Sequence, residues 1–254
     1  MKKYTWFFAA AALLVGGAVQ AATITTLYIT PDMVPDEETP LIFGGAPSGF
    51  GSDSWQNTND LGGKVNWHAR YLADGNFLSA LFPQLNVATL TVGDIASISY
   101  STLRPIGTNA NEDWSLYVYT RNYAGDSSPG SGWYGDRFIN NFGSHGVADG
   151  MWNDYSTDSG MTFSRNSGST VNYANFTDFR TANSSQLIEM ISIQTHSNFA
   201  DFNGAMDGLV ITLTNGDIGR VDFGAVVPVP AAAPLGLLGM GLVAFVRRRK
   251  NAKA

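Results

Sequence analysis

Alternating apolar and polar residues predict β-strands through most of the chain. The clearest runs are 95–101 and 114–120, where β-branched and aromatic residues recur at every second position. Residues 208–214 and 217–223 show the same pattern and flank Asn215-Gly216, a dipeptide typical of two-residue hairpin turns. Four further runs complete the set of expected strands, namely 24–29, 65–72, 133–139 and 187–195.

Helical periodicity is short by comparison. Between the two ends of the chain, only 77–82 and 176–180 favour brief helical turns. The 28 glycines, with many Asn and Ser residues between the apolar runs, supply turn signals at short intervals. We therefore predict an all-β protein, an antiparallel β-sandwich of the jelly-roll or lectin-like type, in preference to a closed barrel.

Residues 1–21 have the three parts of a secretory signal peptide. Lys2 and Lys3 precede an apolar run, and Val19 and Ala21 provide the small residues of a cleavage site after Ala21. The alternative is an N-terminal transmembrane anchor. The apolar run of about 14 residues is short for a bilayer span, which favours the signal peptide.

The other end of the chain, 227–254, combines prolines, an apolar run and a block of cations. Pro228 and Pro230 are incompatible with a helix interior, so a helix is predicted only over 231–246. Sixteen helical residues extend roughly 24 Å, slightly less than a bilayer core of about 30 Å. The basic residues that follow favour retention on the cytoplasmic side. They are Arg247, Arg248, Arg249 and Lys250.

This order of parts resembles the PEP-CTERM sorting signal, which exosortases of Gram-negative bacteria recognise. The resemblance covers Val227 to Lys250, with a Val-Pro-x-Pro motif, an Ala-rich step, a Gly/Leu-rich span and an Arg cluster. Val229 stands where the name-giving motif has Glu, which leaves open the exosortase subtype. The resemblance implies a transient membrane anchor, processing near Pro228–Pro230, and release to the surface or an exopolysaccharide matrix. The alternative is an ordinary, uncleaved membrane anchor.

The chain is thus predicted to have five parts: a signal peptide (1–21), a β-sandwich ectodomain (22–223), a linker with the Val-Pro-x-Pro motif (224–230), a transmembrane helix (231–246) and a basic tail (247–254). Export through the Sec translocon, cleavage by signal peptidase and recognition by an exosortase at the inner membrane follow from this organisation. Short strand motifs at Asp94, Asp113, Trp133 and Asp207 are also similar to bacterial ectodomains without assigned activity that often carry this tail.

Charge is distributed unevenly along the chain. The ectodomain holds 8 Lys and Arg residues against all 21 Asp and Glu residues, a net charge of −13. Nucleic-acid binding depends mainly on Lys and Arg, so an anionic body argues against it. The chain contains no cysteine, which excludes disulfides and a cysteine nucleophile.

Catalytic motifs are sparse. The four glutamates do not form the paired-carboxylate run expected on a strand of a sandwich glycosidase, and Glu189 alone lies within an apolar strand. The three histidines lack metal-ligand spacing. No cofactor and no catalytic residue are predicted.

One stretch suggests a calcium site. Asp201, Asn203 and Asp207 stand at positions 1, 3 and 7 of a glycine-containing segment, as oxygen ligands do in calcium loops. Position 12 is Thr212, where an EF-hand loop has Glu. The alternative is a loop whose Asp and Asn residues hold its own turns. Residues 149–154 have the same ambiguity.

Aromatic residues suggest a glycan-binding surface. Trp133, Asp136 and Arg137 lie within five residues and supply an aromatic face with polar partners. The alternative places Trp114 and Trp133 in the core. Trp55 and Trp152 fall in predicted loops and are expected to be exposed.

The sequence therefore predicts a non-enzymatic, exosortase-sorted protein of the cell surface or extracellular matrix that contacts exopolysaccharide. Two alternatives stay open at this point: a glycan-active enzyme on the same fold, and a permanently tethered adhesion or assembly subunit.

Overall fold

The computed structural model of the protein describes residues 22–29, 41–44, 46–51, 53–56, 66–68, 77–107, 113–123, 134–140, 148–165, 170–195 and 204–223. The predicted signal peptide with Ala21, the linker, the transmembrane helix and the basic tail lie outside these residues. No helix within them has the length and apolar character that a bilayer span requires.

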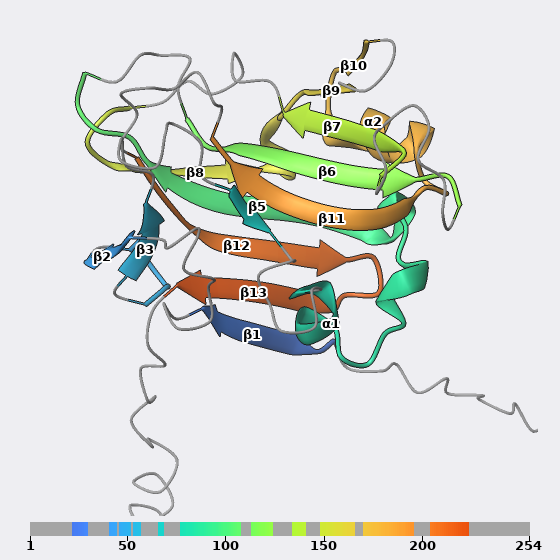
Figure 1. The fold of residues 1–254 in the computed structure, drawn as a ribbon, viewed down its shortest axis with the longest axis horizontal. Helices are drawn as coiled ribbons and strands as arrows, with labels where there is room; N and C mark the ends of the chain where they lie inside the picture. The colour runs from blue at the N-terminus through green and yellow to red at the C-terminus, as the bar shows by residue number, and fades with distance from the viewer. Residues whose placement is uncertain are drawn as a thin grey trace, which may run out of the picture.

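The described residues form a mostly β structure of two largely antiparallel sheets, consistent with a β-sandwich (Figure 1). The first sheet has seven described strands, and β12 is central in it because β13, β5 and β3 all pair with it. β1 and β8 are the outer neighbours of β13 and β5, and β2 pairs β3. The bounds are β1 (Ile24–Ile29), β2 (Leu41–Gly44), β3 (Asp53–Gln56), β5 (Ile95–Leu103), β8 (Trp152–Ser156), β12 (Ala205–Leu213) and β13 (Ile218–Phe223).

The second sheet has six described strands, in the order β10-β9-β7-β6-β11-β4. Every pairing in it is antiparallel. The longest pairing joins β6 to β11. The bounds are β4 (Asn66–His68), β6 (Ser115–Arg121), β7 (Asp136–Asn140), β9 (Phe163–Arg165), β10 (Val171–Tyr173) and β11 (Leu187–Gln194).

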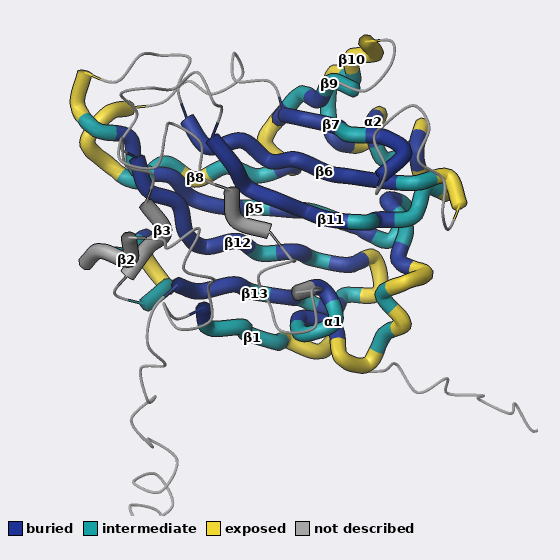
Figure 2. The backbone as a smooth tube through the Cα atoms, in the orientation of Figure 1, coloured by how far each residue is buried: buried dark blue, intermediate teal, exposed yellow. Residues whose placement is uncertain are grey.

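Buried aromatic and aliphatic side chains form one core. Figure 2 shows buried residues along β6, β12 and β13 in dark blue. β6 contributes Leu116 and Val118, and β12 contributes Leu209 and Ile211, all at most 2 % exposed. The short helix α2 (Phe176–Ala182) closes one part of this core, since the ring of Phe179 lies 4.8 Å from that of Phe138. Asn175 caps the helix by accepting a hydrogen bond from the amide of Asp178.

The helix α1 (Phe77–Leu81) packs against β1 and β13. A side chain on Gly219 of β13 would place its Cβ 2.9 Å from atoms of both Leu81 and Phe82. Glycine at this position therefore allows close approach of helix and sheet. Single-turn 3-10 helices in the described part of the chain lie at Val87–Thr89, Val92–Asp94 and Thr157–Ser159.

Two predictions about the fold need correction. The sheets are not wholly antiparallel, because β1 pairs β13 in parallel, from Ile24 opposite Ile218 to Ile29 opposite Phe223. Trp152 does not lie in a loop but is the half-buried first residue of β8, where pairing with β5 overrides the local turn formers. Trp55 likewise belongs to strand β3, and its side chain lies outside the described part of the structure.

Candidate functional site

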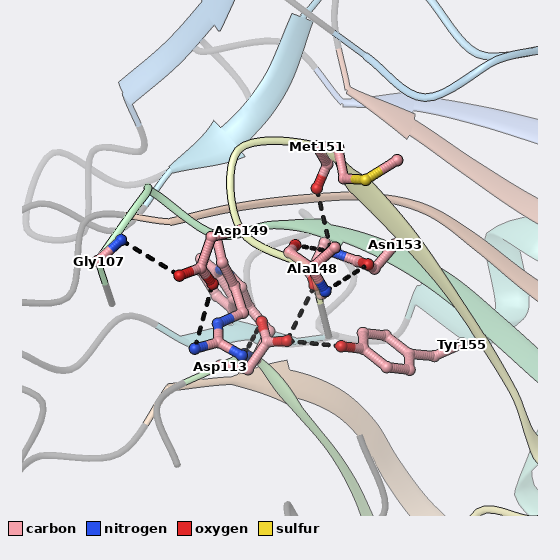
Figure 3. Close-up of polar contacts among 10 residues, drawn as sticks. Gly107, Asp113, Ala148, Asp149, Met151, Asn153 and Tyr155 are labelled. Atoms are coloured by element: carbon pink, nitrogen blue, oxygen red, sulfur yellow. Dashed lines mark hydrogen bonds and ion pairs between the residues drawn. The ribbon is translucent and has the colours of Figure 1, made fainter. Parts of the chain in front are cut away.

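A buried polar arrangement surrounds Asp113, just before β6 (Figure 3). Its Oδ2 accepts hydrogen bonds from the hydroxyl of Tyr155 at 2.8 Å and from that of Thr102 at 3.1 Å. Its Oδ1 accepts one from the backbone amide of Trp114 at 2.7 Å. We call Asp113, its three donors and the nearby Arg104 the Asp113 network. It joins β5, β6 and β8, which come from both sheets.

Burial controls the electrostatics of this network. Asp113 is 2 % exposed, and desolvation raises its pKa from 3.8 to about 6, even though its three hydrogen bonds and the positive charge of Arg104 oppose the shift. Desolvation and the nearby Asp113 carboxyl also raise the pKa of Tyr155, so its hydroxyl stays protonated and donates. Asp113 thus takes up a proton near pH 6, well above the ordinary range of an aspartate.

Arg104 connects the network to the protein surface. Its guanidinium is 2 % exposed and lies 3.5 Å from Oδ1 of Asp149, whose side chain is 30 % exposed. Oδ2 of Asp149 accepts a hydrogen bond from the amide of Gly107 at 3.2 Å. Asn153 caps the same turn by donating to the carbonyls of Ala148 and Met151 (Figure 3). The network therefore fixes two surface loops, 104–107 and 148–151.

A second chain of hydrogen bonds runs between the sheets beside Asp113. Tyr100 of β5 donates to the carbonyl of Trp114 at 3.2 Å and accepts from the side-chain amide of Asn140 at 3.1 Å. Asn140 in turn accepts from the amide of Leu116 at 2.7 Å. These polar groups are satisfied inside the core, which is the condition under which a buried network stabilises a fold.

The chemistry open to the Asp113 network is limited by access. A general acid or base must reach a substrate proton, whereas Asp113 is enclosed and its carboxylate accepts three internal hydrogen bonds. The arrangement positions loops rather than reacting groups. Its surface-facing part, the pair of loops it fixes, is the region available to a ligand or partner.

A second buried carboxylate lies in β12. Asp207 is fully buried, and its Oδ1 accepts from the amides of Gly208 at 2.6 Å and Phe223 at 3.3 Å. Its Oδ2 has no hydrogen-bond partner among the described residues. Desolvation, together with the charge of Asp222 on β13, raises the pKa of Asp207 to about 7.

The segment 46–51 covers this carboxylate pair. Asp222 accepts from the amide of Gly51 at 3.0 Å, and Arg220 donates to the carbonyl of Gly49 while its guanidinium lies 4.7 Å from the ring centre of Phe50. Gly208 adopts a φ of +70°, and a Cβ there would lie 3.0 Å from the Phe50 ring. Backbone donors and one cation thus hold the segment over Asp207.

The predicted calcium residues divide between described and undescribed parts of the chain. Asp201 and Asn203 lie outside the described residues. Asp207 was expected in a loop, but it lies in strand β12, and its Oδ1 accepts hydrogen bonds from two backbone amides. The described residues contain no group of three His, Asp or Glu side chains able to hold a metal. In 149–154, Asp149 pairs with Arg104 and Asp154 accepts from Ser101.

Of the predicted glycan residues, Asp136 and Arg137 are neighbours in β7 and contact different partners. Asp136 is 4 % exposed and pairs with Arg165 at 2.5 Å, whereas the next residue, Arg137, hydrogen-bonds the side chain of Tyr119. Successive strand residues point to opposite faces, so the side chains of Asp136 and Arg137 cannot contact one ligand together. Trp133 lies outside the described residues, and Trp152 lies at the start of β8.

Two other residues singled out from sequence have structural partners. Trp114 is fully buried, as the core alternative predicted. Glu189 lies at a β-bulge of β11 and pairs with Arg121 of β6 at 2.5 Å.

No pattern in the sequence pointed to the Asp113 network as a site. Asp113 marked only the start of a predicted strand, and Tyr155, Thr102 and Arg104 carried no motif. Their proximity arises from pairing of β5 with β8, whose residues are about 50 positions apart, as Ser101 and Asp154 illustrate. No family model, curated protein or solved structure matches the chain.

Proposed function

We propose that this chain is a non-enzymatic, exported protein of the cell surface or extracellular matrix of a Gram-negative bacterium, sorted by an exosortase. The observation that carries the proposal is the four-part sequence of 227–250, a Val-Pro-x-Pro motif, an Ala-rich step, a Gly/Leu-rich span and an Arg cluster. The leader over 1–21 supports the same route through the Sec translocon.

The position of the last strand supports this organisation. β13 ends at Phe223, four residues before Val227. A cut near Pro228–Pro230 therefore leaves every described strand intact. The net charge of −13 over 22–223 suits a body that faces water and neutral or cation-bridged polysaccharide.

Internal use of the carboxylates supports a non-enzymatic role. Glycoside hydrolysis needs two accessible carboxyl groups flanking the scissile bond. In the described residues, most carboxylates accept internal hydrogen bonds or pair with arginine. They are Asp94, Asp113, Asp136, Asp149, Asp154, Glu189, Asp207, Asp217 and Asp222.

We further propose that the sandwich is of the jelly-roll or lectin-like type. In that topology, strand pairs from the two halves of the chain nest inside one another and alternate between sheets. β5 pairs β12 in the first sheet and β6 pairs β11 in the second, which is one such nesting step. Lectin-like sandwiches use exposed aromatic and polar residues for glycans. Trp152 and Arg137 are both half-buried and lie in different sheets, so each would supply a separate glycan contact.

Processing of the tail tests the proposal. The full chain, with an epitope in the body and a second epitope after Ala254, is expressed in a Gram-negative host with and without its exosortase gene. Sorting predicts that the second epitope is lost and the body reaches the medium only when exosortase is present. A matched variant with Pro228→Ala and Pro230→Ala should stay uncut. Retention of both epitopes in membranes of both strains would instead support a permanent tether.

Glycan contact is tested on the mature protein from the same host. Binding to purified exopolysaccharide is measured, together with release of reducing sugars. We expect retention on the polysaccharide without new reducing ends. Chain cleavage would favour the glycan-active alternative, and absence of retention would leave a scaffold without glycan affinity.

A further inference from the structure

Two large apolar side chains project from the loops that the Asp113 network fixes. Ile106, in the loop after β5, is 87 % exposed, and Met151, in the loop before β8, is 56 % exposed. The loops touch, because a Cβ on Gly150 would lie 2.9 Å from Cγ1 of Ile106. We call Ile106 and Met151 the apolar tip.

The loops under the apolar tip are pre-organised. The amide of Gly150 donates to the carbonyl of Arg104 at 2.7 Å, and the amide of Gly107 donates to Asp149 at 3.2 Å. Arg104 and Asp149 also compensate each other's charge at 3.5 Å. A hydrogen-bonded support with a paired Asp149 lowers the cost of placing Ile106 and Met151 in an apolar environment, because little freedom is lost and the charge nearest the tip has a partner.

Strand directions place the apolar tip at the end of the first sheet at which β13, the last described strand, finishes. β13 and β5 are both antiparallel to β12, so their last residues, Phe223 and Leu103, lie at the same end of the sheet (Figure 1). β8 is antiparallel to β5 and begins at that end of the sheet with Trp152. Three strand spacings of about 4.8 Å separate β13 from β8, or roughly 14 Å in all.

The linker is short compared with the sandwich. Residues 224–230 separate Phe223 from the predicted membrane span at 231–246. Seven extended residues reach about 23 Å at most. While the span is inserted, this linker holds the end of the sheet that carries Ile106 and Met151 close to the bilayer.

We propose that the apolar tip contacts the lipid headgroup region of the bilayer that holds the tail. This contact orients the sandwich with that end of its strands toward the membrane before release. This inference rests on the proposed function, since it requires the tail to span the membrane. It adds a surface of the folded body that takes part in the anchored stage.

The chemistry of the tip favours lipid over glycan. Glycan sites combine an aromatic face with open hydrogen-bonding groups, whereas Ile106 and Met151 present aliphatic and thioether surface. The nearby polar side chains Asp149 and Asn153 already bond within the loops. The acidic body adds no attraction to anionic lipids, so contact depends on apolar insertion.

Site-specific fluorescence tests this contact in the full chain. The chain contains no cysteine, so Ile106→Cys labelled with the environment-sensitive dye NBD reports one position. The labelled chain is reconstituted into vesicles of phosphatidylcholine and phosphatidylglycerol, with and without doxyl-labelled lipid as quencher. Thr214→Cys is the matched control, because Thr214 is exposed in the β12–β13 turn at the opposite end of the sheet.

We expect a blue-shifted, strongly quenched signal at position 106 and a water-like, unquenched signal at position 214. Met151→Cys should repeat the result at 106. Flotation after alkaline extraction reports separately whether the tail is inserted. An inserted chain with a water-like signal at 106 and 151 would overturn the contact alone, and so would a shift caused by exopolysaccharide without lipid. Failure to float would overturn the membrane span and, with it, this inference.

Discussion

Tyr155 donates a 2.8 Å hydrogen bond to Asp113, from a strand of the first sheet to a residue that lies two positions before β6 of the second. The two residues are 42 positions apart, and the bond lies beside the Tyr100–Trp114 bond that also spans the sheets. Polar contacts between the sheets therefore supplement the apolar core. They fix the relation of β5, β6 and β8, and with it the loops that carry Ile106 and Met151.

Tyr155→Phe tests the stabilising role of this bond. Removing the hydroxyl leaves a buried carboxyl with one donor fewer, so we expect the free energy of unfolding to fall by roughly 1–3 kcal/mol. Urea denaturation measures the change. Tyr123→Phe is the matched control, since Tyr123 is 66 % exposed and should change stability by less than about 0.5 kcal/mol. Equal effects of the two substitutions would show that the Asp113 network adds nothing to stability.

Asp207 predicts an unusual pH dependence. Its pKa rises from 3.8 to about 7 on folding, so the folded state binds the proton more tightly than the unfolded state. Its contribution to stability is fully present below about pH 4 and is lost as pH rises toward 7. Relative to Asp207→Asn, the wild type should lose stability across this window with a slope approaching about 1.4 kcal/mol per pH unit.

Unfolding free energies of wild type and variant, measured between pH 4 and 8, check this linkage. The difference between the two curves isolates Asp207 from the other carboxylates, such as Asp217, whose lowered pKa acts in the opposite direction. Asp158→Asn, at an exposed position, is the control and should leave the curve parallel to that of the wild type. Parallel curves for Asp207→Asn as well would contradict the burial account of this residue.

Gly208→Ala tests the packing of segment 46–51 on β12. Both Gly208 and Gly160 have positive φ, so alanine costs about 1–2 kcal/mol of backbone strain at each. Only at Gly208 does the new Cβ meet a neighbour, the Phe50 ring at 3.0 Å, and overpacking adds roughly 1–3 kcal/mol. Thermal unfolding should show the larger loss for Gly208→Ala, and the excess should disappear when Phe50→Ala is combined with it. An excess that persists would place the strain elsewhere.

Local pattern predicted much of the fold. The prediction over 24–29 coincides with β1, and Asn215-Gly216 does form the turn between β12 and β13, with Gly216 at a φ of +93°. Both short helical runs correspond to α1 and α2. These elements were accessible because alternation and turn chemistry are properties of neighbouring residues.

What the sequence did not predict depends on distant residues. β8 contains Trp152-Asn-Asp-Tyr-Ser, whose Asn and Asp favour turns, and only its pairing with β5 makes it a strand. The parallel pairing of β1 joins residues nearly 200 positions apart, such as Thr25 and Gly219. The Asp113 network has the same origin, because its two side-chain donors, Thr102 and Tyr155, come from β5 and β8 and no short motif contains them.

The mass of the mature protein tests the central claim most directly. Intact mass spectrometry of the protein recovered from the medium of an exosortase-containing host gives both ends of the chain. The account predicts a start after Ala21 and an end near Pro228–Pro230, without Arg247 to Lys250. A mature protein that still carries this basic block would contradict exosortase sorting.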